Sequence, residues 1–231
     1  MIKIILWDVD GTLLDFEKAE YASIKKCFEI YNLGECTDEM IERYAAINKK
    51  YWEMLERGEI TKPRLLVKRF EEFFAAEGIE TDCAPQFNEE YQIQLGENPV
   101  FCDGGRELVS QLKASGRVKQ YGVTNGTKVA QDGKLNKSRL IDLFDDVFIS
   151  EEIGVEKPGN GFFRHVFEKI GTYAPEEVMI VGDSLTTDIQ GGNNAGIRCC
   201  WYNPGKTVND KQLRIDYEID DLHQILEIID C

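Results

Sequence analysis

The residues best suited to chemistry are two aspartates near the amino terminus, Asp8 and Asp10. They follow an apolar run at residues 4–7 that is too short for a helix and is typical of a buried strand. On an extended backbone, side chains two residues apart point to the same side, so the two carboxylates would repel each other unless a cation lay between them. Asp before Gly is also common in turns, but an unpaired carboxylate next to a buried strand is costly. The pair therefore suggests a metal site.

A second candidate is the segment Thr124-Asn125-Gly126, which follows an expected strand. An Asn-Gly turn after a strand is frequent and needs no function. A functional interpretation is that the Thr124 hydroxyl and the backbone N–H groups of the tight turn hold anionic oxygens, because glycine allows the backbone to approach a phosphate closely.

A third candidate is Lys157, which precedes Pro158. A lone lysine is normally a solvated surface cation. Here, proline restricts the preceding residue to extended conformations, so the lysine is held on a defined backbone. An ammonium group fixed in this way can pair with both a carboxylate and a phosphate.

The fourth candidate is the turn that carries Asp183 and Asp188. One such residue could cap the following helix, but capping does not explain two carboxylates. Magnesium prefers oxygen ligands and keeps several waters, so it would suit a site made of Asp8, Asp183 and one backbone carbonyl.

The elements that must position these residues alternate between strand and helix from residue 98 onward. Strands are expected at residues 120–124, 147–150, 178–181, 199–202 and 217–219. Helices are expected at residues 105–115, 129–141 and 161–170, from about 187, and at 222–229. This order predicts an α/β fold with a parallel sheet covered by helices on both faces, which the first strand also joins. Ligands of such sheets bind at the carboxyl ends of the strands, where Asp8, Thr124, Ser150 and Asp183 fall.

Residues 15–97 show a different pattern, because their apolar residues recur at helical spacing. We expect an all-helical insert of four or more helices. The domains are therefore predicted as a core of residues 1–14 and 98–231 and a helical domain of residues 15–97. Tyr44, Tyr51 and Trp52 of the insert are interpreted as packing residues rather than substrate contacts.

Composition limits the partners. The 231 residues include 27 Lys and Arg against 42 Asp and Glu, and the net charge of −15 disfavours nucleic acid polymers and anionic membranes. No apolar stretch approaches the roughly 20 residues of a membrane span. The seven cysteines form no Cys-x-x-Cys pair and are expected to be reduced. We expect a cytoplasmic protein, monomeric or weakly homo-oligomeric, that takes a small phosphorylated metabolite.

Together, the four segments resemble the four motifs of the haloacid dehalogenase superfamily: Asp8-Val9-Asp10-Gly11-Thr12, Thr124, Lys157, and Gly182-Asp183 with Asp188. The resemblance implies a phosphatase with a Rossmann-like core and an inserted helical (C1-type) cap domain. Residues 48–52, 58–61, 149–154 and 191–196 further resemble the branch called house-cleaning nucleoside 5′-monophosphate phosphatases.

The resemblance also implies a mechanism. Asp8 would attack phosphorus and become an aspartyl phosphate, while Asp10 would protonate the leaving group and later deprotonate a water molecule. Mg²⁺ would be bound by Asp8, Asp183 and the backbone carbonyl of Asp10.

The remaining motif residues would bind the phosphate or support the site. Thr124, Lys157 and the amides of Asn125 and Gly126 would hold the phosphate oxygens. Asp188 would orient Lys157 or a metal-bound water. Many relatives have a second aspartate at the position of Ser184, so this chain has one fewer charge near the metal.

Asp10 also bears on the type of reaction. The dehalogenase branch of the superfamily lacks this acid, because halide leaves without a proton, so Asp10 favours phosphate esters. A sugar phosphatase or a β-phosphoglucomutase-like phosphoryl transferase is the alternative. A non-catalytic acidic interaction protein is a remote third possibility, and the joint presence of Asp8, Asp10, Lys157 and Asp183 argues against it.

Overall fold

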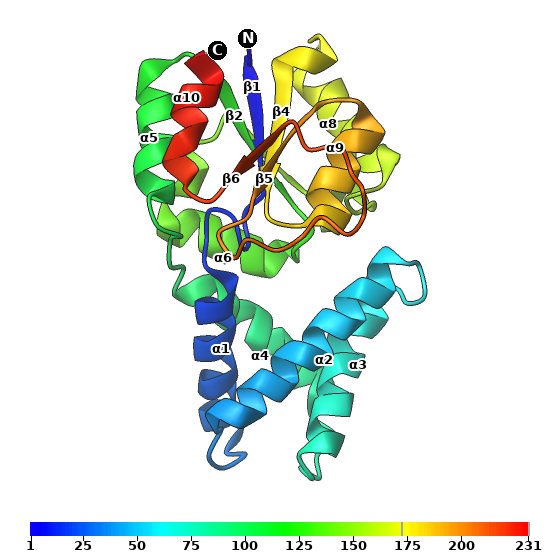
Figure 1. Ribbon diagram of the computed structural model, residues 1–231. Helices are drawn as coiled ribbons and strands as arrows, with labels where there is room; N and C mark the ends of the chain where they lie inside the picture. Colours follow the sequence, from blue (N-terminus) through cyan, green and yellow to red (C-terminus); the bar gives the residue numbers. More distant parts are fainter. Residues whose placement is uncertain (172, 231) are drawn as a thin grey trace.

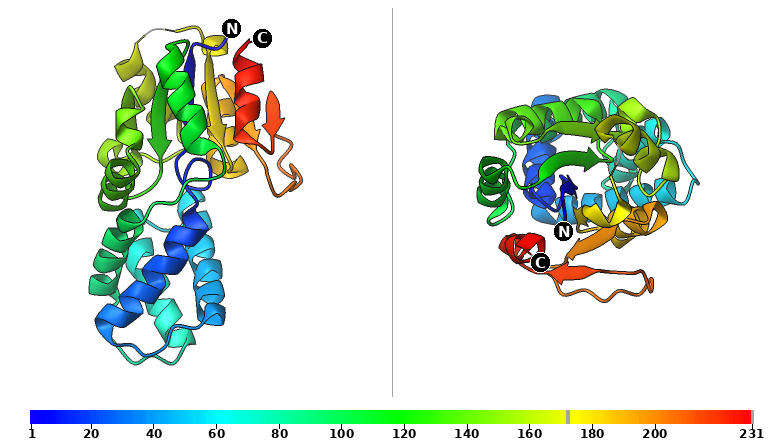
Figure 2. Two further views of the ribbon diagram at one scale, coloured as in Figure 1. Left: turned by 90° about the vertical axis from the view of Figure 1, so that its left-hand side faces the viewer. Right: turned by 90° about the horizontal axis from the view of Figure 1, so that it is seen from above.

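The computed structural model describes residues 1–171 and 173–230 and shows two stacked parts (Figure 1). A sheet flanked by helices forms one part, and a bundle of four helices lies at one end of it. Both chain termini lie at the opposite end of the sheet domain, far from the bundle (Figures 1 and 2). One of the seven cysteines, Cys231, lies outside the described residues, and the other six are free thiols.

The sheet has six parallel strands in the order β3-β2-β1-β4-β5-β6. The strands are β1 (Ile4–Trp7), β2 (Lys119–Thr124), β3 (Asp146–Ile149), β4 (Val178–Gly182), β5 (Arg198–Tyr202) and β6 (Tyr217–Ile219). The predicted α/β class is confirmed, and each expected strand is present within one residue of its expected bounds. Because β1 pairs with both β2 and β4, their carboxyl ends meet at one edge of the sheet.

Strand β1 lies between β2 and β4 in the sheet. Both of its faces are covered, as its continuous apolar run predicts. Ile5 and Trp7 point into a core formed with α5 (Gly105–Ser115) and α10 (Ile225–Asp230), whereas Ile4 and Leu6 point into a core formed with α8 (Asn160–Ile170). All four side chains are fully buried. The indole of Trp7 donates a hydrogen bond of 3.1 Å to the buried side chain of Gln120 on β2, so its polar atom is satisfied as well.

Helices cover both faces of the sheet (Figure 2). They are α5 (Gly105–Ser115), α6 (Lys128–Ser138), α7 (Ser150–Ile153), α8 (Asn160–Ile170), α9 (Gln190–Ala195) and α10 (Ile225–Asp230). Short 3-10 turns are η1 (Leu140–Asp142), η2 (Pro175–Glu177) and η4 (Leu222–Gln224). None of the helices in the described part of the chain is long and apolar enough to cross a membrane.

The helix expected at residues 129–141 is shorter than predicted. It ends at Ser138, because Arg139 adopts a left-handed conformation with φ of 64° and its N–H closes the last turn. The chain then continues in the separate turn η1. Left-handed residues terminate helices because they turn the next peptide away from the helix axis.

The helix expected from about residue 187 is also different. It begins two residues earlier as a π-helical turn, η3 (Leu185–Ile189), and continues as α9. The Ser184 hydroxyl caps this turn by accepting a hydrogen bond of 3.2 Å from the N–H of Thr187. Single π-helical turns often occur at functional sites, and this one carries Asp188.

The bundle consists of α1 (Phe16–Tyr31), α2 (Asp38–Glu56), α3 (Lys62–Ala76) and α4 (Ala84–Glu97). Its core is rich in aromatic rings in edge-to-face contact, such as Phe28 with Phe87 at 6.0 Å and Tyr44 with Tyr91 at 5.8 Å. Such pairs stabilise a core beyond the area that they bury. Tyr44 is fully buried, in keeping with the packing role that we predicted.

The bundle meets the sheet domain where α4 packs against α6. Gly96 of α4 lies so close to Gly133 of α6 that a Cβ atom on Gly96 would come within 2.9 Å of the Cα of Gly133. The two connections to the bundle are hydrogen-bonded to each other, because Asp15 donates to Val100 at 2.9 Å and Cys102 donates to Leu13 at 2.9 Å. Helix α6 is therefore held directly against the bundle.

Candidate active site

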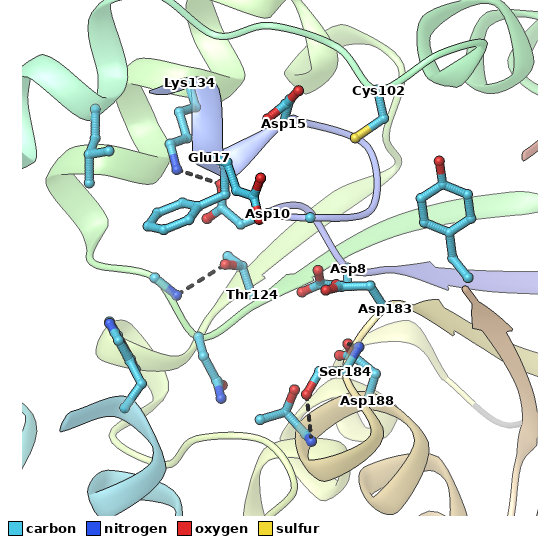
Figure 3. A pocket seen from close by; sticks show the side chains of 18 of the residues that line it. Asp8, Asp10, Asp15, Glu17, Cys102, Thr124, Lys134, Asp183, Ser184 and Asp188 are labelled. Atoms are coloured by element: carbon cyan, nitrogen blue, oxygen red, sulfur yellow. Dashed lines mark hydrogen bonds and ion pairs between the residues drawn. The ribbon is translucent and has the colours of Figure 1, made fainter. Parts of the chain in front are cut away.

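The carboxyl ends of the central strands open into a cavity of about 850 Å³ between the sheet domain and the bundle (Figure 3). All eight candidate residues from the sequence line it: Asp8, Asp10, Thr124, Asn125, Gly126, Lys157, Asp183 and Asp188. The topology thus brings together residues from four loops that are far apart in the chain.

Lys157 lies at the base of this cavity and is only 2% exposed. Its ammonium donates to Asp8 Oδ1 and Asp188 Oδ1, both at 2.7 Å, and to the carbonyl of Val123 at 2.8 Å. Burial disfavours the charged ammonium, but the attraction of Asp188 and Asp8 outweighs it and raises the pKa of Lys157. The lysine is therefore a fixed cation whose three donors are all in use.

The Asn125 side chain holds the backbone of Lys157. Its amide nitrogen donates to the Lys157 carbonyl and its amide oxygen accepts from the Lys157 N–H, each at 2.8 Å. From the sequence, only the backbone amide of Asn125 was expected to act. In the structure, its side chain also holds the loop that carries Lys157 against the loop after β2.

Asp188 is held by contacts to both of its carboxylate oxygens. Oδ1 accepts from Lys157, and Oδ2 accepts from the N–H of Ser184 at 3.2 Å. The preceding strand must pass close by, since a Cβ atom on Gly182 would lie 2.3 Å from the Asp188 carboxylate. Asp188 was expected to orient either Lys157 or a metal-bound water, and these contacts match the orientation of Lys157.

Asp183 is positioned by Thr12 and by its own backbone. The Thr12 hydroxyl accepts from the Asp183 N–H at 3.1 Å and lies 3.1 Å from Asp183 Oδ1 and 3.3 Å from Asp8 Oδ2. The Trp201 indole donates to the Asp183 carbonyl at 2.9 Å. Gly11 has φ of 90°, and a Cβ atom there would lie 2.7 Å from the Asp183 carboxylate, so the turn requires glycine.

Asp8, Asp183 and Asp188 form a cluster in which one carboxylate oxygen of each lies within 4.8 Å of the others. Burial, followed by repulsion from Asp188, raises the pKa of Asp8 well above its usual value. Desolvation and then Asp188 raise the pKa of Asp183 to about 7. Lys157 balances only part of this charge, so a divalent cation with oxygen ligands fits the cluster.

Thr124 and Gly126 form the expected tight turn after β2. The Thr124 hydroxyl accepts a hydrogen bond of 3.0 Å from the N–H of Gly126, so the two groups predicted to hold anionic oxygens are paired with each other. A Cβ atom on Gly126 would lie 2.2 Å from the Gln131 side chain. Glycine at this position therefore leaves room for a side chain of α6 to reach the cavity.

Asp10 points away from the carboxylate cluster and toward α6 (Figure 3). Its Oδ2 accepts a hydrogen bond of 2.6 Å from the amide of Gln131, and its Oδ1 forms an ion pair with Lys134. Asp8 and Asp10 therefore differ in their surroundings, since one is paired with Lys157 and the other with residues of α6.

With this geometry in place, the comparisons with known proteins identify the family. The sequence profile of the haloacid dehalogenase-like hydrolases matches residues 5–202. The chain belongs to the haloacid dehalogenase-like hydrolase family. The resemblance inferred from the four motifs is thereby confirmed.

Three relatives of this hydrolase are informative. It is 36% identical over 227 residues to the HAD-hydrolase YfnB of Bacillus subtilis, with 98% of this chain and 95% of YfnB covered. It is 34% identical over 228 residues to the pyrimidine 5′-nucleotidase PynA of Streptococcus pneumoniae (99% and 95% covered) and 28% identical over 225 residues to the pyrimidine 5′-nucleotidase YjjG of Escherichia coli (97% and 96% covered).

A crystal structure of YfnB bound to magnesium matches this hydrolase over 100% of this chain and 99% of that chain. The TM-score is 0.93 at 35% sequence identity, and that crystal form reveals interdomain movement in YfnB. The fold, including the arrangement of sheet and bundle, is therefore shared with a magnesium-binding relative.

The bundle of this hydrolase also contributes a lysine to the edge of the site. Lys62, at the start of α3, donates to the Asn125 carbonyl at 3.0 Å and to the Ser150 hydroxyl at 2.8 Å, and pairs with Glu156 at 3.1 Å. Its side chain is almost completely buried. This tie between the bundle and the loop after β2 was not predicted from the sequence.

Other bundle side chains also line the cavity. They include Phe16, Glu17, Lys18, Trp52, Glu56, Arg69, Gln92 and Leu95. Trp52, which we interpreted as a packing residue, is among them, so that interpretation was incomplete. The bundle side of the cavity combines aromatic, amide and charged groups, and the sheet side is dominated by carboxylates and Lys157.

Proposed function

We propose that this protein is a magnesium-dependent phosphomonoesterase that forms an aspartyl-phosphate intermediate and acts on nucleoside 5′-monophosphates, pyrimidine nucleotides in particular. The observation that carries the proposal is the buried ion pair between Lys157 and Asp8, with a second carboxyl group, Asp10, two residues away in the same cavity. The names of PynA and YjjG support a pyrimidine nucleotide as substrate.

In the first step, a carboxylate oxygen of Asp8 forms a bond to phosphorus while the ester P–O bond breaks on the opposite side. Asp10 gives its proton to the departing oxygen of the substrate. Lys157 fixes the orientation of Asp8 and offsets part of the negative charge that the phosphate brings to the carboxylate cluster.

In the second step, Asp10 takes a proton from a water molecule as that water attacks the phosphorus of the phosphorylated Asp8. The bond between Asp8 and phosphorus then breaks, and inorganic phosphate leaves. Asp8 is a carboxylate again and Asp10 carries a proton, so both residues are ready for another cycle.

The phosphate oxygens need donors, and the turn after β2 supplies them. In the structure, the Thr124 hydroxyl accepts a hydrogen bond from the N–H of Gly126. When phosphate binds, this hydroxyl, this N–H and the backbone N–H of Asn125 can all donate to its oxygens. We propose that these groups hold the transferring phosphoryl group, with Lys157 on its other side.

The donor set suits Mg²⁺, because the cluster offers only oxygen ligands and its three carboxylates share a single lysine, Lys157, which pairs with Asp8 and Asp188. Asp8, Asp183 and the backbone carbonyl of Asp10 would hold the ion. When bound, the ion neutralises charge shared by the nucleophile and the phosphate. Asp188 supports the site by holding Lys157 in place.

We further propose that residues 15–97 form a cap domain on a catalytic core of residues 1–14 and 98–231. The cap contributes Trp52, Glu56 and Arg69 to the lining of the cavity. A nucleoside attached to the phosphate would lie against this lining, so these residues are placed to select the substrate.

A phosphate-release screen with Mg²⁺ tests the proposal. It should include uridine, cytidine, adenosine and guanosine 5′-monophosphates, hexose phosphates and glyceraldehyde 3-phosphate, with an excess of chelator and an Asp8→Asn variant as controls. Selective release from pyrimidine nucleotides is expected. Release from sugar phosphates alone, or a requirement for a sugar bisphosphate, would favour a sugar phosphatase or a phosphomutase instead.

A further inference from the structure

Two side chains of α6, Gln131 and Lys134, contact the Asp10 carboxylate, and Figure 3 shows the contact of Lys134. Gln131 donates its amide to Oδ2 at 2.6 Å, and Lys134 forms an ion pair with Oδ1. Residues three apart on a helix lie on the same face, so α6 holds both carboxylate oxygens at once. The two contacts join segments more than a hundred residues apart in the chain.

Both side chains are buried to an unusual degree for their type. Gln131 is 0% exposed and Lys134 is 1% exposed. Desolvating an ammonium and an amide is unfavourable, and a buried ion pair contributes little net stability compared with apolar packing of the same volume. A helix that only had to pack would be better served by apolar residues, so stability does not account for this pair.

The surroundings keep Gln131 and Lys134 in place. Gly126 leaves the space for Gln131, because a Cβ atom there would lie 2.2 Å from its amide nitrogen. The Lys134 ammonium lies 5.0 Å from the centre of the Phe16 ring, at the start of the bundle. Helix α6 is capped by the Thr127 hydroxyl and packs against α4. The backbone that carries Gln131 and Lys134 is therefore held in place.

The amide of Gln131 can also accept a hydrogen bond, which suits a contact to Asp10 whether or not Asp10 carries a proton. The Oε1 atom of Gln131 is buried and has no hydrogen-bond partner among the described residues. An amide carries both donors and an acceptor, so by rotating it can hydrogen-bond a carboxylate or a carboxylic acid. This suits a group that loses and regains a proton in every cycle.

We propose that Gln131 and Lys134 are positioning residues that fix the Asp10 side chain for proton transfer to the leaving group. The inference rests on the proposed function, in which Asp10 is the general acid. Its consequence is specific: loss of either contact should slow departure of a basic leaving group, which needs a proton, and should spare a leaving group that departs as a stable anion.

The experiment compares phenyl phosphate with p-nitrophenyl phosphate, which differ little in size but strongly in the basicity of the leaving group. The measured quantity is kcat/KM, since it reports only the steps up to departure of the leaving group and not the later attack of water. Variants are Lys134→Met, Gln131→Leu and Lys134→Arg. The matched control is Lys137→Met, since Lys137 lies on the same helix but is exposed and pairs with Glu97.

For Lys134→Met and Gln131→Leu we expect kcat/KM to fall ~10- to 100-fold with phenyl phosphate, part of the range of a lost general acid, and by less than about threefold with p-nitrophenyl phosphate. Lys134→Arg should restore much of the loss, and Lys137→Met should change neither substrate. Added to Asp10→Asn, the Lys134→Met change should cause no further loss, because it acts through Asp10.

Equal losses with both substrates, or a full further loss in the Asp10→Asn background, would overturn the positioning role while leaving the proposed function intact. Failure of the wild-type protein to release phosphate from both esters and from every substrate of the phosphate-release screen would instead overturn the proposed function, and this inference with it. Circular dichroism melting of each variant separates a folding defect from these outcomes, and Gln131→Leu provides the same test if Lys134→Met does not fold.

Discussion

The Lys157 ammonium lies 2.7 Å from the Oδ1 atom of Asp8, and the two residues are 149 positions apart in the chain. Both side chains are buried at the carboxyl edge of the sheet, where Asp8 directly follows β1 and Lys157 lies in the loop between α7 and α8. The contact fixes the orientation of the proposed nucleophile and places a permanent cation beside it. Most of the proposed chemistry depends on this pair.

Replacing Lys157 by Met should therefore affect both activity and stability. We expect kcat/KM for phosphate esters to fall by ~10²- to 10³-fold, as for loss of one preorganised donor. Removing one partner of a buried ion pair should also lower the free energy of unfolding by about 3–5 kcal/mol, because Asp8 and Asp188 would face each other without a cation. Urea unfolding and steady-state kinetics measure the two effects. An unchanged unfolding free energy would contradict the ion-pair assignment.

Asp10→Asn should separate metal binding from proton transfer. Since only the backbone carbonyl of Asp10 is assigned to the ion, Mg²⁺ affinity measured by calorimetry should stay within a few-fold of wild type. Turnover of an alkyl phosphate should fall by roughly 10² to 10⁴, as expected for a lost general acid. Asp183→Asn is the matched control and should weaken Mg²⁺ binding strongly. Equal loss of metal affinity in both variants would exclude this division of roles.

The raised pKa of Asp183 makes stability depend on pH in the absence of metal. Its pKa is about 7 in the folded protein against an ordinary value of 3.8, so the folded state binds the proton more tightly. The resulting stabilisation is fully present at low pH and is lost as the pH rises through about 7.

The stability measurement uses a chelator and two pH values, ~5 and ~8, which lie on either side of the raised pKa. Between them, the free energy of unfolding of the wild type should fall more than that of Asp183→Asn. Urea titrations at both pH values measure the difference. Saturating Mg²⁺ should raise the melting temperature of the wild type at the higher pH, because the ion binds the ionised carboxylates. The same pH dependence in both proteins would argue against the assignment.

Lys62→Met should remove the hydrogen bonds between the bundle and the loop after β2. Lys62 donates to the Asn125 carbonyl and to Ser150, and charge-assisted hydrogen bonds of this kind contribute about 1.5–3 kcal/mol. We expect kcat/KM to fall at least ~10-fold, the equivalent of ~1.4 kcal/mol. Lys68→Met, at an exposed position on the same helix, is the control and should behave as wild type. Similar kinetics of the two variants would show that the tie has no catalytic role.

The strand ends and their polar residues could be predicted from the sequence because the signals are local. The apolar run before Asp8 and the alternation of strands and helices after residue 98 define a parallel sheet, and such sheets bind ligands at one edge. The helical pattern of residues 15–97 was equally clear, since it depends only on the spacing of apolar residues.

The contacts of Lys62, Gln131 and Lys134 could not be predicted in the same way. Polar residues on an amphipathic helix normally face water, and their partners here come from segments more than sixty residues away. One signal was available. Gln131 and Lys134 fall next to Ala130 and Leu135 on the buried side of α6, where a lysine and a glutamine need a partner.

The central claim is that Asp8 becomes phosphorylated, and trapping that intermediate tests it most directly. The wild-type protein is mixed with Mg²⁺ and a substrate found in the phosphate-release screen, quenched with acid and reduced with borohydride, which converts an aspartyl phosphate to homoserine. Peptide mass spectrometry then reads residue 8. Homoserine at position 8, present only with substrate, is the predicted result. Rapid phosphate release with unmodified Asp8 would contradict the account.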